Sequence, residues 1–176
     1  MTGQDPRHMM LVGGGHAHAA VLADWIENGL PTARATLLTP YRHLRYSGMV
    51  PGWIAGKYGR NDGTVDLAAL AEQAGVQLVL GRCTGIDPEA RWIRTGGGQV
   101  MEYDIASLDT GGVGRARDVL GKDTRLIDVR PIDRFVERLE RIEDASHFAV
   151  IGGGAAGVEI AFALRNRARN GARARA

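Results

Sequence analysis

Two glycine-rich stretches have the residue types and spacing of phosphate-binding loops. The first is LVGGGHAHAAVL, with Gly13 and Gly15, and the second is FAVIGGGAAGVEIAFAL, with Gly152, Gly154 and Gly157. In a G-x-G-x-x-G loop between a strand and a helix, the first glycine makes the turn and the second lets the backbone meet a pyrophosphate. The third glycine permits close packing of helix on strand, and the helix N-terminus donates amide hydrogens. The sequence therefore predicts two dinucleotide loops.

The first loop departs from the fingerprint at its third glycine, where His18 stands. This replacement predicts a wider approach of helix to strand, or a reoriented histidine side chain. His16 and His18 also raise the question of a metal. Residues at i and i+2 of a helix point in different directions, and no nearby Cys, Asp or third His completes a metal site. We predict no metal and favour a packing or loop-orienting role for the histidines, with direct contact to a cofactor as the alternative.

The ribose of a dinucleotide is usually held by an acidic residue at the end of the second strand. The corresponding stretch here, ATLLTP, ends with Thr39. A hydroxyl can also bond a ribose, although more weakly than a carboxylate. For the second loop the equivalent position lies about 20 residues beyond Gly157, at or past Ala176. We therefore expect the second nucleotide-binding unit to be incomplete in this chain.

The composition is that of an ordinary globular protein. The 176 residues are 44% hydrophobic and 24% charged, with 22 basic against 20 acidic residues. This balance gives no argument for nucleic acid as a partner. The single cysteine excludes an internal disulfide, and no uncharged apolar run reaches the length of a membrane helix. We expect a cytoplasmic protein without a transmembrane segment.

The elements that position the first loop follow from the apolar pattern. Met9 to Val12 reads as a buried strand, Ala17 to Asn28 as a helix ended by Gly29, and Ala35 to Leu38 as the next strand. These make one βαβ unit. A long polar-aromatic loop follows, TPYRHLRYSGMVPGWIAGKYGRNDG. Asp66 then caps a short helix that runs through Ala74, and VQLVL gives a third strand.

The later pattern changes twice. Short runs between Arg82 and Tyr103 predict three antiparallel strands in a meander, and DIASLDTGG predicts a return to a buried strand. Residues 114–130 read as a linker. A helix then begins at Pro131, with an apolar stripe formed by Ile132, Phe135, Val136, Leu139 and Ile142. His147 to Ile151 predicts a new strand, and Val158 to about Arg169 a new helix. The fold class is α/β and Rossmann-like, with a parallel sheet and an antiparallel meander.

The two loops, the meander and the SLDTGG turn between them resemble the family of pyridine nucleotide-disulfide oxidoreductases that bind FAD and NAD(P). The stretches GGGHAH, RYSGMVPGWIAGKY and SLDTGG are similar to the branch close to type II NADH dehydrogenases, which includes a flavoprotein module fused to some selenide, water dikinases. The resemblance covers residues 9–168. It implies an FAD-binding domain over residues 1–113, a linker over 114–130 and the start of an NAD(P)-binding domain over 131–176.

The resemblance also implies the cofactor contacts. Gly13, Gly15, His16 and Ala17 would hold the FAD pyrophosphate and Thr39 would take the ribose position. Cys83 would lie by the adenine, Thr110 and Gly111 would close over the cofactor, and Arg42 to Pro51 would run beside the flavin ring. The NAD(P)H pyrophosphate would lie on Gly152, Gly154 and Gly157, with Glu159 near the nicotinamide.

The implied activity is hydride transfer from NAD(P)H to FAD and on to a quinone or another small-molecule acceptor, and no residue is nominated as catalytic. Without a redox disulfide the transfer would be direct. We expect the chain alone to be inactive, and the alternative is a stand-alone nucleotide-binding module without redox activity. Apolar residues of the last helix (Val158, Ile160, Ala161, Phe162 and Leu164) predict a homodimer through the second unit. Peripheral contact with a membrane is left open.

Overall fold

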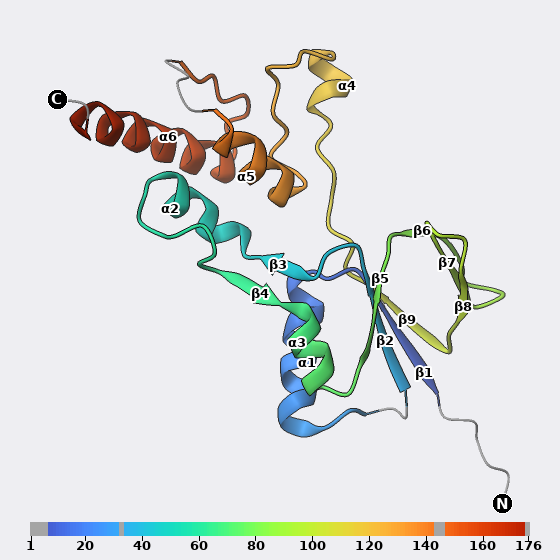
Figure 1. Ribbon diagram of the computed structural model, residues 1–176. Coiled ribbons are helices and arrows are strands. Elements are labelled where there is room, and N and C mark those ends of the chain that lie inside the picture. The colour runs from blue at the N-terminus through green and yellow to red at the C-terminus, as the bar shows by residue number, and fades with distance from the viewer. Residues whose placement is uncertain (1–6, 32–33, 143–146, 175–176) are drawn as a thin grey trace, which may run out of the picture. The chain divides into compact units, whose positions relative to one another are not determined.

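The computed structural model describes residues 7–31, 34–142 and 147–174, and it divides into two compact units (Figure 1). The first unit comprises Met1–Leu44 and Val65–Gly111, and the second comprises Arg45–Thr64 and Gly112–Ala176. The chain passes between them along two short paired strands, β3 (His43–Arg45) and β4 (Thr64–Asp66). Among the described residues, none of the helices combines the length and the apolar character needed to cross a membrane.

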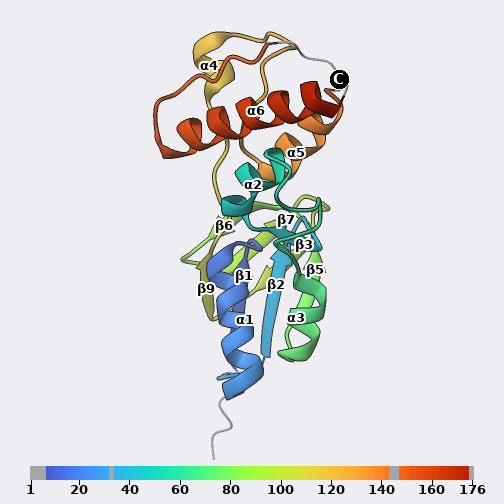
Figure 2. The ribbon, with the colours of Figure 1, turned by 90° about the vertical axis from the view of Figure 1, so that its left-hand side faces the viewer.

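A four-stranded parallel sheet is the centre of the first unit. Its strands are β1 (His8–Val12), β2 (Arg34–Thr39), β5 (Gln77–Leu80) and β9 (Ile105–Leu108), in the order β5-β2-β1-β9. Helices α1 (His16–Asn28) and α3 (Leu67–Gln73) lie on one face. The antiparallel meander of β6 (Cys83–Asp87), β7 (Trp92–Thr95) and β8 (Val100–Glu102) lies on the other, as Figure 2 also shows. The predicted fold class is confirmed.

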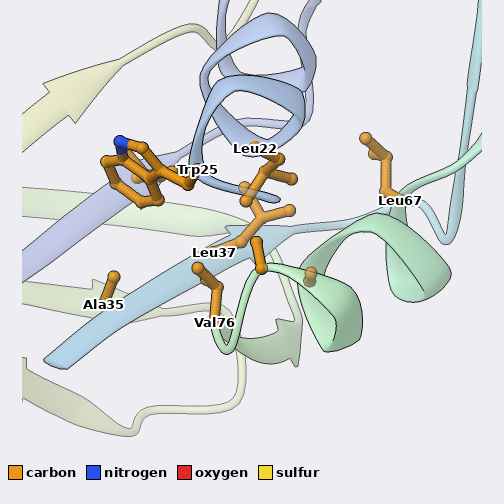
Figure 3. Packing of buried hydrophobic residues seen from close by; sticks show 9 residues of the cluster. Leu22, Trp25, Ala35, Leu37, Leu67 and Val76 are labelled. Atoms are coloured by element: carbon orange, nitrogen blue, oxygen red, sulfur yellow. The ribbon is translucent and has the colours of Figure 1, made fainter. Parts of the chain in front are cut away.

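The two central strands have apolar side chains on both faces because each face is covered. Leu11 and Leu37 pack toward α1 and α3, and Met10 and Leu38 pack toward the meander. Figure 3 shows the helical side of this core, where Leu22 and Trp25 of α1 meet Leu37, Leu67 and Val76. Strands buried on both faces read as continuous hydrophobic runs, which explains the uninterrupted MMLV of β1.

Local signals fixed the helix ends of this unit. Asp66 is the N-cap of α3, and its carboxylate accepts hydrogen bonds from the backbone amides of Ala68 and Ala69 at 2.9 and 3.2 Å. Gly29 and Gly75 follow α1 and α3 with positive φ angles of 87° and 69°, a conformation that glycine adopts without strain. The predicted boundaries of these helices are therefore confirmed to within one or two residues.

Two predictions for this part of the chain were wrong. The strand in DIASLDTGG was expected to be buried, yet among the described residues β9 is an edge strand that pairs with β1 alone, and Ile105 and Leu108 are 44% and 60% exposed. The stretch from Thr39 to Gly63 was expected to be a loop. It contains β3, a 3₁₀ turn (Ser47–Met49) and helix α2 (Val50–Ile54), because Val50 and Ile54 are buried in the core of the second unit.

The second unit is a cluster of helices. It contains α2, α4 (Ala116–Leu120), α5 (Ile132–Glu140) and α6 (Ala155–Ala174), so the predicted linker over 114–130 includes one short helix. The predicted stripe of α5 is confirmed, since Phe135, Val136 and Leu139 are buried and Ile132 and Ile142 pack beside them. Ile160 and Leu164 of α6 are buried in the same cluster, whereas Val158 and Phe162 are 46% and 67% exposed.

The strand predicted for His147 to Ile151 is absent. Residues 147–153 have no regular structure, and Val150 and Ile151 are 38% and 68% exposed. An isolated extended segment leaves its backbone donors and acceptors unpaired, so an apolar run becomes a strand only beside another strand. Within the described residues no strand pairs with this segment. The prediction failed because an apolar run does not specify its partner.

Candidate functional site

The carboxyl ends of the parallel strands bring the candidate residues of the first unit to one edge of the sheet. Val12 is paired with Leu38 on one side and Leu108 on the other. The chain turns directly after each of these strands: Gly13 N donates to Leu38 O at 2.8 Å, and Asp109 N donates to Val12 O at 2.8 Å. In open α/β sheets this edge is where ligands bind.

Gly13 is required by two independent features of the loop. Its φ angle of 101° is disfavoured for any residue with a side chain, and a Cβ atom there would lie 2.1 Å from the carbonyl oxygen of Asp109. A Cβ on Gly14 would lie 2.8 Å from the Thr39 hydroxyl. The first loop therefore packs closely against both neighbouring strand ends, as a dinucleotide loop must.

The N-terminus of α1 is capped from a distant part of the chain. Gly15 is the N-cap and has no side chain, so it cannot accept the first amide hydrogens. The Asp109 carboxylate does so instead: its Oδ2 accepts from the backbone amides of Ala17 at 3.0 Å and His18 at 3.2 Å. Asp109 was not among the predicted site residues. No signal in its own stretch of sequence identifies it, because its position depends on the pairing of β9 with β1.

His18 is buried, with 2% of its surface exposed. Its Nδ1 lies 2.6 Å from the carbonyl oxygen of Gly13, and its Nε2 lies 2.9 Å from the Ser107 hydroxyl. The carbonyl can only accept, so Nδ1–H donates to it and Nε2 accepts from the serine. The side chain thus joins the glycine loop to β9, which agrees with the loop-orienting role. His16 and Ala17 are exposed at the start of α1.

Thr39 lies beside the loop but is 1% exposed. Its hydroxyl is 3.3 Å from both the backbone amide and the carbonyl oxygen of Tyr41. A contact from this hydroxyl to a ribose would require the side chain to exchange these partners. The ribose role of Thr39 therefore stays a prediction.

Arg42 lies farther along the same connection and pairs with the N-cap of α3. Its guanidinium is 3.6 Å from the Asp66 carboxylate, and the His43 imidazole is 3.8 Å from the same oxygen. The pKa of Asp66 lies below its ordinary value. The main cause is the hydrogen bond from the Ala69 amide, and the Ala68 amide and the Arg42 charge lower it further. Asp66 is therefore a carboxylate that holds the Arg42 side chain near the edge of the sheet.

The remaining predicted residues of the first unit lie in and after the meander. Cys83 begins β6 and is half-buried, with its Sγ 3.5 Å from the carbonyl oxygen of Gly85. Thr110 and Gly111 follow Asp109, and the Thr110 Cα would be 2.8 Å from a Cβ on Gly13. Gly111 has a φ of 69°. Thr110 is thus in contact with the first loop, while the roles predicted for these residues toward a cofactor stay predictions.

The second loop is formed only in part. Gly152 has a φ of 119°, and a Cβ on Gly157 would lie 2.2 Å from the carbonyl oxygen of Gly152, so the turn into α6 is close. The helix begins at Ala155, and Val158 N donates to Gly154 O at 3.1 Å. Glu159 is exposed on α6. Without a strand before it, this loop lacks the sheet that positions the first one.

The first loop has the chemistry to hold a dinucleotide pyrophosphate. It joins a buried strand to a helix, its glycines place no side chain over the backbone, and its helix amides already bond one anionic oxygen, that of Asp109. A carboxylate oxygen is the side-chain counterpart of a phosphate oxygen. In the described residues no group of three His, Cys, Asp or Glu side chains is placed to hold a metal ion.

Known proteins similar to this chain include a sulfide-quinone reductase, a ferredoxin reductase and an NADH oxidase. The sulfide-quinone reductase of Aquifex aeolicus (strain VF5) is 26% identical over 105 residues, which are 60% of this chain and 24% of that protein. The crystal structure of the ferredoxin reductase for the CYP199A2 system from Rhodopseudomonas palustris superposes with a TM-score of 0.76 and 25% identity, covering 92% of this chain and 41% of that one.

A water-forming NADH oxidase from Lactobacillus brevis, solved bound to NADH, has a TM-score of 0.68 at 18% identity and shares the fold over 91% of this chain and 37% of its own. The chain therefore spans 24% of the curated relative and 41% of the ferredoxin reductase. Residues 7–172 match the family described as pyridine nucleotide-disulphide oxidoreductase. Reductases of this family use FAD together with NAD(P)H. The chain belongs to the pyridine nucleotide-disulphide oxidoreductase family.

Proposed function

We propose that this chain binds the pyrophosphate of FAD on its first loop and works in an FAD-dependent NAD(P)H oxidoreductase. The observation that supports this most is the N-terminus of α1, where amide donors at a glycine loop already hold an anionic oxygen, in a chain whose family match covers residues 7–172. Gly13, Gly15, His16 and Ala17 would surround the pyrophosphate. Thr39, Arg42, Cys83, Thr110 and Gly111 would border the rest of the cofactor.

When bound, FAD supplies the hydride- and electron-transfer chemistry, and the protein supplies binding and orientation. The part of this chain is to fix the loop. His18 holds the Gly13 carbonyl at 2.6 Å, so the loop backbone is oriented before a nucleotide arrives. The amides of α1 are then already in place for a phosphate once the Asp109 carboxylate has turned away. No side chain of the chain is proposed to transfer a proton.

For the second nucleotide we propose that Gly152, Gly154 and Gly157 meet the NAD(P)H pyrophosphate and that Glu159 lies toward the nicotinamide. The acceptor we propose is a quinone, since the curated relative is named a sulfide-quinone reductase. The division into an FAD-binding domain over 1–113 and an NAD(P)-binding domain from 131 is part of this proposal. A cytoplasmic location and a homodimer through α6, which exposes Val158 and Phe162, stay predictions.

The proposal is tested by incubating the purified chain with FAD, removing free flavin by gel filtration and measuring the absorbance that stays with the protein. Two glycines at opposite ends of α1 make a matched pair of variants. Gly13→Ala would place a Cβ 2.1 Å from a backbone oxygen, whereas at Gly29, which also has a positive φ, nothing lies within 4 Å of a Cβ. We expect retained flavin in the wild type and in Gly29→Ala, and its loss in Gly13→Ala.

A third variant, Gly15→Val, separates flavin loss from misfolding. Gly15 has an ordinary φ of −81°, and the three atoms nearest to a Cβ there all belong to the Asp109 carboxyl group, the end of a side chain. We expect this variant to keep the circular dichroism of the wild type and to lose flavin, because the isopropyl group covers the loop backbone. A wild-type chain that takes up no flavin, or a Gly15→Val variant that keeps all of it, would contradict the proposal.

A nucleotide-binding module without redox activity is the second candidate. It is favoured by one observation, that the first loop has its sheet while residues 147–153 have no strand. An assay of NADH oxidation distinguishes the oxidoreductase from the module. The FAD-loaded chain is mixed with NADH and a soluble quinone, and the decrease in NADH absorbance is recorded. Oxidation above the rate of free FAD supports the oxidoreductase, and bound flavin without oxidation supports the module.

A further inference from the structure

The Asp109 carboxylate occupies the space that the first loop leaves open. A Cβ on Gly15 would lie 2.2 Å from both the carboxyl carbon and the Oδ2 atom of Asp109. The second glycine of the fingerprint is the one that lets the backbone approach a pyrophosphate. In this chain the group that lies against the backbone of Gly15 is the Asp109 carboxylate, at the point where a phosphate would bind.

The hydrogen bonds of Asp109 are those of a helix N-cap made by a residue far away in sequence. Asp66 caps α3 in the ordinary way, with distances of 2.9 and 3.2 Å to the amides two and three residues on. Asp109 reaches the equivalent amides of α1, those of Ala17 and His18, at 3.0 and 3.2 Å. Each carboxylate thus uses donors that a phosphate on the same helix would need.

We propose that Asp109 is an internal competitor of nucleotide phosphate at the first loop, so that its negative charge lowers the affinity of the chain for a dinucleotide. This inference rests on the proposed binding of FAD there. Two anionic groups cannot share the same two amides, and their charges repel at contact distance. The carboxylate must therefore turn away before a phosphate can take its place.

The side chain of Asp109 could move away from α1, whereas its backbone is held in place. The backbone amide of Asp109 donates to Val12 O at 2.8 Å, which continues the sheet, so this part is fixed. The residue is half-buried, so rotation of its side chain toward solvent is the movement that would free the two amides. A binding site that is open in only a fraction of the molecules has its apparent affinity reduced by that fraction. Asp109 therefore sets the affinity without contacting a reacting atom.

The test is calorimetric titration of ADP into the full chain, comparing the wild type with Asp109→Ala and Asp109→Asn. We expect ADP to bind about tenfold more tightly to Asp109→Ala, the size of a helix-terminus charge interaction. Asp109→Asn, which keeps a neutral acceptor, should lie between them. Adenosine has no phosphate and should bind all three chains alike, which a general change in folding would not produce.

Asp87→Asn is the matched control. The Asp87 carboxylate also accepts from two backbone amides, those of Glu89 and Ala90 at 3.0 and 2.8 Å, but it lies in a turn of the meander. This variant changes the net charge equally and should leave ADP affinity at the wild-type value. Thermal melting of each variant checks that the fold is kept, and Asp109→Asn is the variant to rely on if Asp109→Ala fails to fold.

The outcomes separate this inference from the proposed function. Tighter binding of ADP, with adenosine unchanged, supports it. Weaker or equal binding of ADP to folded Asp109→Asn overturns it and leaves the loop as a nucleotide site in which Asp109 helps or is neutral. If neither the wild type nor any Asp109 variant binds ADP or FAD, the proposed function fails, and this inference fails with it.

Discussion

His18 stands where the fingerprint has a glycine that allows close helix packing, and it makes hydrogen bonds that a glycine could not make. The ring bonds the Gly13 carbonyl on one side and the Ser107 hydroxyl on the other. A glycine at this position would let α1 approach the strand, but it would leave both partners without their hydrogen bonds. The loop is therefore positioned by a side chain in place of backbone contact.

Restoring the fingerprint glycine should destabilise the protein. His18→Gly removes two hydrogen bonds of about 1 kcal/mol each and adds the cost of a helical glycine, about 1 kcal/mol, so we expect a loss of about 3 kcal/mol in unfolding free energy. Ala20→Gly, at an exposed position of α1, isolates the glycine cost. Urea unfolding measures both. Equal losses in the two variants would show that the His18 contacts contribute nothing.

His8 gives the first unit a dependence on pH. It is 6% exposed; its Nδ1 lies 2.8 Å from the Glu102 carbonyl oxygen and 3.0 Å from the Arg34 guanidinium, and its Nε2 lies 2.9 Å from the Thr36 hydroxyl. Burial is the main cause that lowers the pKa of His8 below 6.5, and the Arg34 charge adds to it, against the opposing effects of the Glu102 bond and the Asp104 charge. The folded chain therefore favours the neutral ring.

The sign of the effect follows from proton uptake. Below pH 6.5 the unfolded chain binds a proton at His8 that the folded chain binds only at lower pH, so stability is complete above 6.5 and falls as the pH is lowered. We expect His8→Gln to lose less stability than the wild type between pH 7 and pH 5, measured by urea unfolding at each pH. Parallel curves for wild type and His8→Gln would contradict the assignment.

At the scale of elements, the sequence predicted those whose signals are local. The βαβ unit, the Asp66 cap and the three strands of the meander each have their apolar period and their turn residues in one stretch of chain. Three features depended on partners far away in sequence. The exposure of β9, helix α2 within an expected loop, and the missing strand at 147–151 are decided by which segments lie beside them. A local pattern does not contain that information.

The candidate site shows the same limit. Both glycine loops could be read from spacing alone, and so could the departure at His18. Asp109 could not be recognised from its own neighbours, because its role depends on β9 pairing in parallel with β1. Ser107 is a partner of His18 for the same reason. Residues that act across a sheet become visible only when the strand order is known.

Two phenylalanines of the second unit differ in burial and should therefore differ in their effect on stability. Phe135 of α5 is 5% exposed within the helical cluster, and Phe162 of α6 is 67% exposed. We expect Phe135→Ala to cost about 3 to 4 kcal/mol of unfolding free energy, since it removes a buried ring and leaves a cavity. Phe162→Ala should change it by about 0.5 kcal/mol or less. Urea unfolding followed by helical circular dichroism compares them, and a large loss in Phe162→Ala would show that this ring is covered in solution.

At the scale of the whole molecule, the two glycine loops belong to different compact units and differ in completeness. The first loop follows a strand that is paired on both sides, and its glycines contact two neighbouring strand ends. The second follows a segment without a strand, and around Gly152, Gly153 and Gly154 nothing lies within 4 Å of a Cβ. A phosphate loop that is not held before binding must be ordered by the ligand, which weakens binding.

This difference predicts unequal responses to the two nucleotides, which hydrogen exchange can resolve along the chain. FAD should slow exchange in residues 13–19 and 109–111, because binding to the folded first unit stabilises it. NADH at the same concentration should leave residues 152–160 at their unliganded rates, because its affinity is reduced by the cost of ordering the loop. ADP, which shares a pyrophosphate with both, should follow FAD. Protection of residues 152–160 by NADH would show that α6 and its glycine turn suffice for binding without a strand, and protection by FAD in that segment in place of the first would reverse the assignment of the two loops.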